Sequence, residues 1–215
     1  MISSTVHIID DDVHLARALT RLLRAHGYGV QSYRHAAQFL AYKLPAGPAC
    51  LLLDLKMPEI TGLDLQEILT REIENLPVIF MSGQADAESS IRAMKAGAVD
   101  FLLKPFDDHQ LLTAVRTALS LADEALSKRE VLKRDQMAFV SLSPRERQVC
   151  LRIVQGLLNK QVGYELGTSE KTVKIQRARI MQKLGASSLP DIVRLVERLR
   201  SAGAIPSHPA RPSHL

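Results

Sequence analysis

The sequence predicts an α/β domain built on a mostly parallel five-stranded sheet, followed by a separate all-helical domain. Short apolar runs alternate with helical patterns in the first part of the chain, and only helical patterns follow residue 141. Charge divides the chain in the same way: residues 1–122 carry 11 Lys and Arg against 14 Asp and Glu, and residues 141–215 carry 13 against 5. A chain of 215 residues can form two small domains with separate cores. Only the basic part is suited to a polyanion such as DNA.

Five short apolar runs bounded by turn residues are the expected strands. Such runs are typical of strands buried on both faces of a parallel sheet, although a buried helical segment gives the same pattern. Because the runs alternate with helical segments, we expect βαβ units. The five runs are Thr5 to Asp10, Gly29 to Tyr33, Ala49 to Asp54, Pro77 to Ser82 and Val99 to Lys104.

Leucines at helical spacing lie between these runs. Apolar residues at i, i+4, i+7 and i+8 predict an amphipathic helix with one buried face. The pattern is clear after the first and third runs, which supports strands that alternate with helices. The residues that form it are Leu15, Leu19, Leu22 and Leu23, and, in a shorter version, Leu65, Ile68 and Leu69.

The segment 122–140 is charged and helical, with little apolar surface, so we expect a continuing helix that acts as a semi-rigid linker. Ser143 and Glu146 then form a capping box around Pro144, which begins a new helix. We expect four short helices, at about 144–155, 160–166, 170–184 and 190–201. The predicted domain limits are 1–121, 122–140 for the linker and 141–204, with a disordered tail at 205–215.

Polar residues stand at the carboxyl ends of the expected strands, where open α/β sheets bind their ligands. Asp10–Asp12, Asp54, Ser82 and Lys104 end four of the five strands. Carboxylates gathered there repel one another unless a cation lies among them, and oxygen ligands favour Mg²⁺. Asp54 can attack phosphorus, while Ser82 and Lys104 can bind phosphoryl oxygens. Each residue alone could be a solvated strand end, but their coincidence predicts a phosphoryl-transfer site.

Residues 1–122 resemble the receiver domain of two-component response regulators. The resemblance implies a doubly wound parallel sheet of order 2-1-3-4-5. The motifs that carry it are Asp10-Asp11 after the first strand, Asp54-Leu-Lys-Met-Pro, Ser82-Gly83, Ala96-Gly97-Ala98, Phe101 and Lys104-Pro105-Phe106. One departure is Gly83-Gln84-Ala85-Asp86, where similar relatives often have Gly-His-Gly-Asp after the switch hydroxyl. The lost glycine stiffens this loop.

The resemblance also assigns a role to each residue of the site. It implies that Asp54 is the phosphoacceptor. It implies that Mg²⁺ binds to Asp10, Asp11, Asp54 and the main-chain carbonyl of Lys56. Ser82 and Phe101 are then expected to be the switch pair, and Lys104 to contact the phosphoryl group.

A helix, a tight turn with glycine and a second helix describe residues 158–184, a motif that can place its second helix in the major groove. On a helical wheel Val173, Ile180 and Leu184 share the face expected to be buried. The opposite face carries Lys174, Ile175, Ala178 and Arg179. A basic outer face can be merely solvated, but an apolar residue between basic ones suits contact with a thymine methyl group.

Residues 141–200 resemble the LuxR-type helix-turn-helix domain, and the whole chain resembles a FixJ-like response regulator. The motifs are Leu142-Ser-Pro-Arg-Glu-Arg, Gly156-Leu-Leu-Asn-Lys, Ser169-Glu-Lys-Thr-Val-Lys and Lys183-Leu-Gly-Ala-Ser-Ser. The resemblance implies that Lys174 and Ile175 read bases. It implies phosphate contacts by Asn159, Lys160, Thr172 and Arg179, with Lys171 and Arg177 as further DNA contacts. Gln176 and Gly163-Tyr164 depart from the usual pattern, so the target sequence cannot be transferred.

The favoured hypothesis is therefore a transcription factor that a sensor histidine kinase phosphorylates on Asp54, and that then binds promoter DNA as a homodimer. We do not expect an enzyme. A phosphatase that uses an aspartyl-phosphate normally has a second acid two residues after the nucleophile, where this chain has Lys56. A dinucleotide-binding protein would need a glycine-rich loop after the first strand. A DNA-binding protein whose receiver works without phosphate remains a third hypothesis.

The two cysteines and the N-terminus indicate the compartment. Cys50 and Cys150 lie in apolar patterns without metal-ligand spacing, so we expect buried thiols and a reducing environment. The N-terminus lacks the pattern of a secretory signal, and no apolar stretch is long enough to span a bilayer. We therefore expect a cytoplasmic protein with no membrane association.

Overall fold

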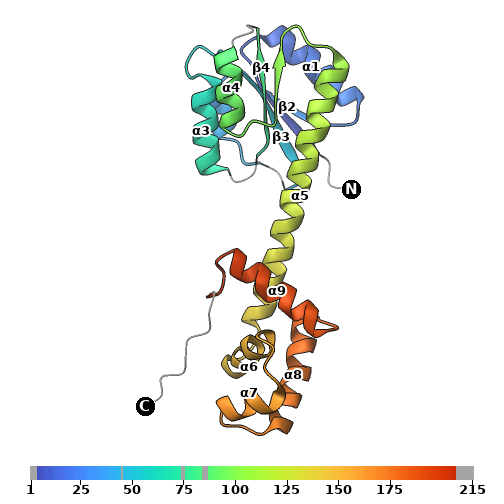
Figure 1. The fold of residues 1–215 in the computed structure, drawn as a ribbon. Coiled ribbons are helices and arrows are strands. Elements are labelled where there is room, and N and C mark those ends of the chain that lie inside the picture. Colours follow the sequence, from blue (N-terminus) through green and yellow to red (C-terminus); the bar gives the residue numbers. More distant parts are fainter. Residues whose placement is uncertain (1–3, 45, 74–75, 84–86, 207–215) are drawn as a thin grey trace. The chain divides into compact units, whose positions relative to one another are not determined.

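The computed structural model describes residues 4–206, except for 45, 74–75 and 84–86. It contains two compact units, Met1–Ser127 and Lys128–Leu215, which are described separately (Figure 1). The predicted stiffening at Gln84-Ala85-Asp86 lies outside the described residues, and so does most of the tail predicted to be disordered. Among the described residues no helix is both long and apolar enough to cross a membrane.

The first unit contains a five-stranded parallel sheet of order β2-β1-β3-β4-β5, which confirms the predicted fold class and strand order. Each predicted strand is present, with ends that differ by at most one residue. The strands are β1 Thr5–Ile9, β2 Gly29–Tyr33, β3 Ala49–Asp54, β4 Val78–Ser82 and β5 Asp100–Leu103.

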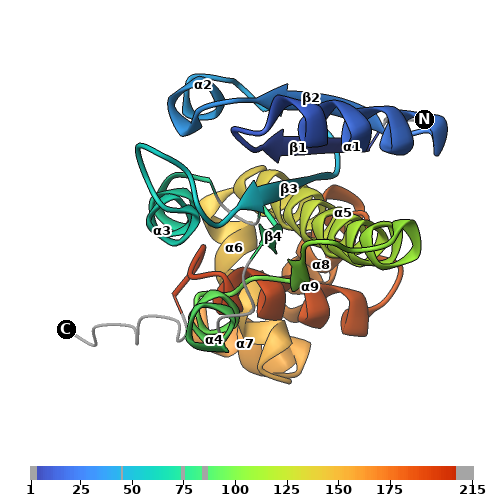
Figure 2. The ribbon, with the colours of Figure 1, turned by 90° about the horizontal axis from the view of Figure 1, so that it is seen from above.

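Helices cover both faces of the sheet, as Figure 2 shows. On β3, Cys50 and Leu52 pack into the core beneath α1 and α5, while Leu51 and Leu53 pack into the core beneath α2, α3 and α4. A strand buried on both faces needs an unbroken apolar run, which explains the sequence pattern. The helices are α1 Val13–Ala25, α2 Ala36–Leu40, α3 Gly62–Glu72, α4 Ala87–Lys95 and α5 Asp108–Val140.

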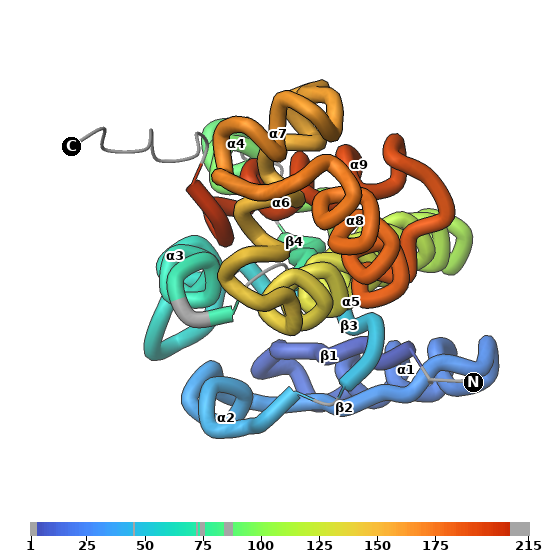
Figure 3. Tube along the Cα trace, turned by 90° about the horizontal axis from the view of Figure 1, so that it is seen from below, coloured from blue at the N-terminus to red at the C-terminus, as the bar shows by residue number. Residues whose placement is uncertain are grey.

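The second unit contains the four predicted short helices, which Figure 3 shows as a tube. They pack around one apolar core. Val173, Ile180 and Leu184 are buried, which confirms the predicted core face of the helix Glu170–Leu184. The predicted capping box of Ser143 and Glu146 begins the first of these helices. The helices are α6 Pro144–Val154, α7 Asn159–Glu165, α8 Glu170–Leu184 and α9 Leu189–Ser201.

The end of α5 packs against the core of the second unit. Phe139 is buried there, Leu132 packs at its edge, and Arg198 Nε donates a hydrogen bond of 2.7 Å to Asp135 Oδ2. The continuous helix predicted over 122–140 is present, but its last turns contribute more apolar contact than the sequence indicated. The domain limits at 121 and 141 stay predictions, since only truncated chains can show which segments fold alone.

Candidate functional site

Lys104 joins two carboxylates at the carboxyl edge of the sheet. Its Nζ lies 2.8 Å from Asp10 Oδ2 and 2.8 Å from Asp54 Oδ1. Asp10 follows β1, Asp54 ends β3, and Lys104 follows β5, so three strands converge on one ammonium group. Asp10 and Asp54 are both buried, and the Lys104 side chain is 23% exposed. The adjacency expected from strand ends is therefore present.

Three carboxylates form a group that could hold a cation. One oxygen from each of Asp10, Asp11 and Asp54 lies within 4.8 Å of the others. Asp11 is exposed and the other two are buried, which leaves an open side toward solvent. An oxygen-only donor set of this kind fits Mg²⁺, which usually keeps several waters and takes one or two carboxylates. Lys56 follows β3 by two residues, in the loop beside the group.

Asp12 has a different role from its two acidic neighbours. Its Oδ1 accepts hydrogen bonds from the main-chain N–H groups of His14 and Leu15, at 2.8 and 3.2 Å. It is therefore the N-cap of α1. These backbone hydrogen bonds lower the pKa of Asp12. The third acid of the Asp10–Asp12 run fixes the start of a helix, and the first two remain available for a cation.

The electrostatic balance of the site favours binding a further positive charge. Burial raises the pKa of Asp54; Lys104 lowers it, and Asp10 and Asp11 add to the rise. Burial lowers the pKa of Lys104, but its hydrogen bonds to Asp10 and Asp54 outweigh burial, and the pKa is raised overall. A single ammonium thus leaves the carboxylate repulsion partly uncompensated. A divalent cation would lower the pKa of Asp54 and favour its ionised, nucleophilic form.

The two residues predicted to be the switch pair, Ser82 and Phe101, lie on β4 and β5. Ser82 ends β4 and is buried, and its main-chain oxygen accepts a hydrogen bond of 2.7 Å from the Lys104 N–H. Phe101 is half-buried on β5 and packs at the edge of the core that lies under α3 and α4. The structure thus links the backbone of Ser82 directly to that of Lys104.

Gly62 was not identified from the sequence as part of the site. A Cβ at this position would lie 2.6 Å from the main-chain oxygen of Asp54 and 2.9 Å from Phe80 Cε1. Only glycine therefore lets the start of α3 approach the end of β3. The available sequence signal was the pair Thr61-Gly62, since Thr61 is the N-cap of α3.

The outer face of α8 carries the predicted DNA-binding side chains. Lys171, Thr172, Lys174, Ile175 and Arg179 are all exposed, and Ile175 is 48% exposed. Lys160 of α7 is exposed as well. Within the described part of the chain these lysines and Arg179 have no ion pair with the protein. Basic side chains on one helix face, around an exposed isoleucine, match the arrangement expected for a helix in the major groove.

Two of the predicted DNA-binding residues contact each other. Arg177 Nη1 of α8 donates a hydrogen bond of 2.9 Å to Asn159 Oδ1, at the first residue of α7. Both side chains are half-buried. Thr172 lies at the start of α8, where its Oγ1 is 2.9 Å from Oγ of the N-cap residue Ser169. Lys183 Nζ lies 2.7 Å from Glu146 Oε2, so this lysine holds α8 to α6.

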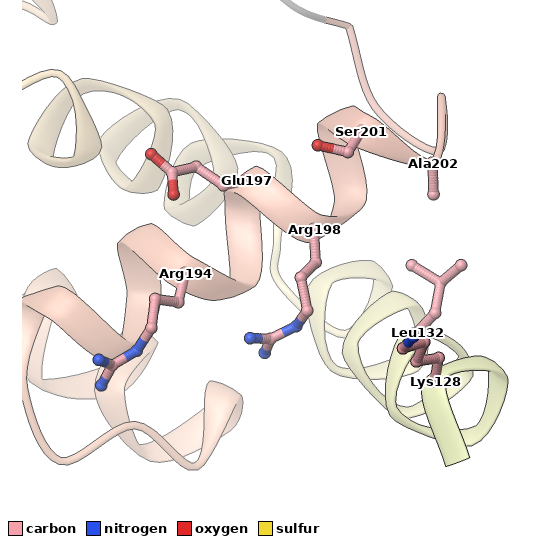
Figure 4. Close-up of a pocket in the computed structure, with 7 residues that line it drawn as sticks. All are labelled: Lys128, Leu132, Arg194, Glu197, Arg198, Ser201 and Ala202. Atoms are coloured by element: carbon pink, nitrogen blue, oxygen red, sulfur yellow. The ribbon is translucent and has the colours of Figure 1, made fainter. Parts of the chain in front are cut away.

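A second basic region surrounds a groove of about 540 Å³ between α5 and α9 (Figure 4). Lys128 and Leu132 come from α5, and the other labelled residues come from α9 and its end. Arg194 pairs with Asp191 and Arg198 with Asp135, each at 2.7 Å. Because both guanidinium groups are paired, the groove is a weaker candidate for DNA than the face of α8.

Family models match both units of the chain. The model "Response regulator receiver domain" matches residues 6–116. The model "Bacterial regulatory proteins, luxR family" matches residues 140–196. Together they cover the carboxylate site and all of the helices α6, α7 and α8.

Full-length relatives have the same organisation. The response regulator protein TmoT of Ectopseudomonas mendocina is 42% identical over 93% of this chain and 90% of its own length. The transcriptional regulatory protein FixJ of Azorhizobium caulinodans is 39% identical over 98% of this chain and 99% of its own. The structure of the response regulator StyR matches with a TM-score of 0.83 and 41% identity, over 91% of this chain and 99% of StyR. The chain belongs to the two-component response regulators that join a receiver domain to a LuxR-type DNA-binding domain.

Proposed function

We propose that a sensor histidine kinase transfers a phosphoryl group to Asp54, and that the phosphorylated protein binds promoter DNA through α8 as a homodimer. The observation that carries this proposal is the position of Lys104 Nζ, 2.8 Å from both Asp10 and Asp54. A nucleophilic carboxylate, a cation and a second acid thus meet at the carboxyl edge of the sheet. This is the set of groups that phosphoryl transfer needs.

In the transfer, an oxygen of Asp54 attacks phosphorus as the bond from phosphorus to the kinase's histidine nitrogen breaks. The nitrogen keeps the bonding electron pair, and Asp54 becomes an acyl phosphate. Lys104 then donates a hydrogen bond to a phosphoryl oxygen while it keeps Asp10 as its partner. Asp10, Asp11, Asp54 and the main-chain carbonyl of Lys56 would hold Mg²⁺. That ion supplies positive charge that offsets the phosphoryl oxygens.

The signal leaves the site through Ser82 and Phe101. The Ser82 hydroxyl moves to bind a phosphoryl oxygen. Phe101 then turns inward, into the space that Ser82 leaves. The support is their location on β4 and β5, with the Ser82 carbonyl bonded to the Lys104 N–H. Phosphorylation shifts the equilibrium between the two arrangements of Ser82 and Phe101 only by the difference in its interaction with each. The change in their populations is therefore expected to be modest.

Exposed apolar side chains on α4 and β5 support a dimer that phosphorylation favours. Ile91 is 54% exposed, Met94 48% and Leu103 44%. They lie in the segment that ends with β5, next to Phe101. Burial of these side chains against a second copy would favour association, and a change at Phe101 would alter the surface beside them.

For DNA, Lys174 and Ile175 contact bases, and the surrounding residues contact phosphates. Both side chains are exposed, on the face of α8 opposite the buried Val173, Ile180 and Leu184. A dimer then binds two half-sites about one helical turn apart. The phosphate contacts are Asn159, Lys160, Thr172 and Arg179, and Lys171 and Arg177 belong to the same DNA-binding surface.

Incubation with a small phosphodonor and Mg²⁺, followed by intact-protein mass spectrometry, tests the assignment. We expect one phosphoryl group per chain, none on Asp54→Asn, and greatly reduced labelling of Asp11→Ala. Asp12→Asn is the matched control, because Asn also caps a helix and Asp12 is not a proposed ligand. Undiminished labelling of Asp54→Asn sinks the assignment.

The same variants separate the alternatives. If the receiver works without phosphate, wild type and Asp54→Asn bind DNA equally, with and without phosphodonor. If the protein is a phosphatase, it turns over a phosphomonoester substrate, which we do not expect because Lys56 stands where a second acid is normally found.

A further inference from the structure

We propose that Arg177 acts on DNA through Asn159, as a positioning residue, and that the two side chains form one phosphate-binding unit. The inference rests on the proposed DNA-binding function and deepens it. On the sequence alone the two residues counted as separate contacts, one on each helix of the motif. The structure joins them by a hydrogen bond of 2.9 Å from Arg177 Nη1 to Asn159 Oδ1.

The hydrogen bond determines which end of the Asn159 amide faces outward. A carboxamide has an acceptor oxygen and a donor NH₂, and nothing in its shape fixes which points where. A guanidinium group only donates, so the oxygen must face Arg177. The NH₂ group is left to face away from Arg177. In the described part of the chain that group has no hydrogen-bond partner.

An outward NH₂ group can pair only with an acceptor. Asn159 is the first residue of α7, beside the exposed Lys160, whose charge attracts the DNA backbone. The acceptor that fits is therefore a phosphate oxygen. Without Arg177 the amide can rotate to present its oxygen, which a phosphate repels. The guanidinium thus orders the contact before DNA binds and reduces the cost of ordering it.

Arg177 differs from the other cations of this surface in its burial. Lys160, Lys171, Lys174 and Arg179 are exposed, whereas Arg177 is half-buried and bonded across the two helices. An independent contact by Arg177 would need its guanidinium group to leave Asn159. A positioning role keeps the hydrogen bond and uses the amide as the group that touches DNA.

The prediction is that the losses caused by the two substitutions are not additive. Asn159→Ala and Arg177→Ala should each weaken DNA binding by about tenfold, the size of one net hydrogen bond at a charged group. The double variant should bind no more weakly than Asn159→Ala alone. As a matched control, Lys171→Ala should multiply the loss of Asn159→Ala, because the structure shows no contact between those two side chains.

The experiment is a fluorescence anisotropy titration of the intact protein with a random-sequence duplex, at several salt concentrations. Arg177→Lys keeps the charge and one possible donor. If charge alone matters, Arg177→Ala lowers affinity equally with and without Asn159, and Arg177→Lys restores it in both backgrounds. For a positioning role, Arg177→Ala has an effect only when Asn159 is present, and Arg177→Lys restores affinity only then.

Asn159→Asp provides a second arm that does not disturb the pair. Aspartate keeps the shape and gains an ion pair with Arg177, so folding is preserved, but it aims a carboxylate at the phosphate. Binding should fall well below that of Asn159→Ala; binding equal to or tighter than Asn159→Ala overturns the inference. Multiplicative losses for Asn159 and Arg177, with normal wild-type binding, also overturn it. A wild-type protein that does not bind DNA overturns the proposed function itself.

Discussion

A buried histidine on β1 should make the receiver domain sensitive to acid. His7 of β1 is fully buried, with its ring 5.9 Å from that of Tyr33, 5.4 Å from Phe39 and 5.8 Å from Tyr42. Its Nδ1 lies 3.1 Å from the Tyr33 hydroxyl, and no described residue pairs with its Nε2. A protonated ring would therefore lie in an aromatic surrounding without a counter-ion.

Burial lowers the pKa of His7 to about 4. Because the unfolded chain binds this proton with a pKa near 6.5, the unfolded state holds more protons than the folded state between the two values. Stability is therefore lost as pH falls from about 6.5 to about 4, by up to 1.4 kcal/mol per pH unit. Between pH 7 and pH 5 the loss from His7 alone is about 2 kcal/mol. Burial raises the pKa of Tyr33, so it stays neutral over this range.

The assay is urea unfolding of wild type and His7→Phe at pH 7 and at pH 5. Carboxylates titrate in both proteins, so the difference between them isolates the histidine. We expect wild type to lose about 2 kcal/mol more than His7→Phe on acidification. Equal losses in the two proteins would show that His7 is not buried in its neutral form, and would refute this reasoning.

Three further predictions concern the sites. Gly62→Ala should lower stability by about 1 to 3 kcal/mol and slow labelling, since its Cβ would lie 2.6 Å from the main-chain oxygen of Asp54. Gly83→Ala is the control, because a Cβ there meets open space. Calorimetry measures the stability of both variants and mass spectrometry their labelling. Sedimentation should show more dimer with phosphodonor, and Ile91→Glu should remove the increase; an identical monomer population in both conditions counts against the dimer. Lys174→Ala should cost about 1 to 3 kcal/mol of binding free energy at the operator and much less on random DNA. Arg179→Ala should weaken binding to both DNAs and flatten the slope of log affinity against log salt by about one unit. An equal loss for Lys174→Ala on both DNAs would make Lys174 a phosphate contact.

The sheet was predictable because burial of a strand on both faces produces an unbroken apolar run in the sequence. β3 is buried on both faces, so its apolar run is unbroken, and Asp54 ends it at the edge where parallel strands place their ligands. The meeting of Asp54 with Lys104 follows from that rule, although they lie 50 residues apart. Residues at the carboxyl ends of parallel strands lie close together because these ends meet at one edge of the sheet.

Contacts set by packing between elements were not predictable. Phe139 and Asp135 lie in a charged helical segment, and helical spacing alone does not show which core such a helix joins. The Arg177–Asn159 bond crosses a turn between helices, and its geometry depends on how those helices pack. The surroundings of His7 were not predictable either, because its partner Tyr33 comes from the adjacent strand β2.

The central claim is that phosphorylation of Asp54 controls DNA binding. The measurement that tests it most directly is an anisotropy titration of the intact protein on operator DNA, with and without a small phosphodonor in Mg²⁺, for wild type and Asp54→Asn. The proposed mechanism predicts that the phosphodonor tightens binding by wild type and leaves Asp54→Asn unchanged. Equal tightening in both proteins, or no change in fully phosphorylated wild type, would contradict it.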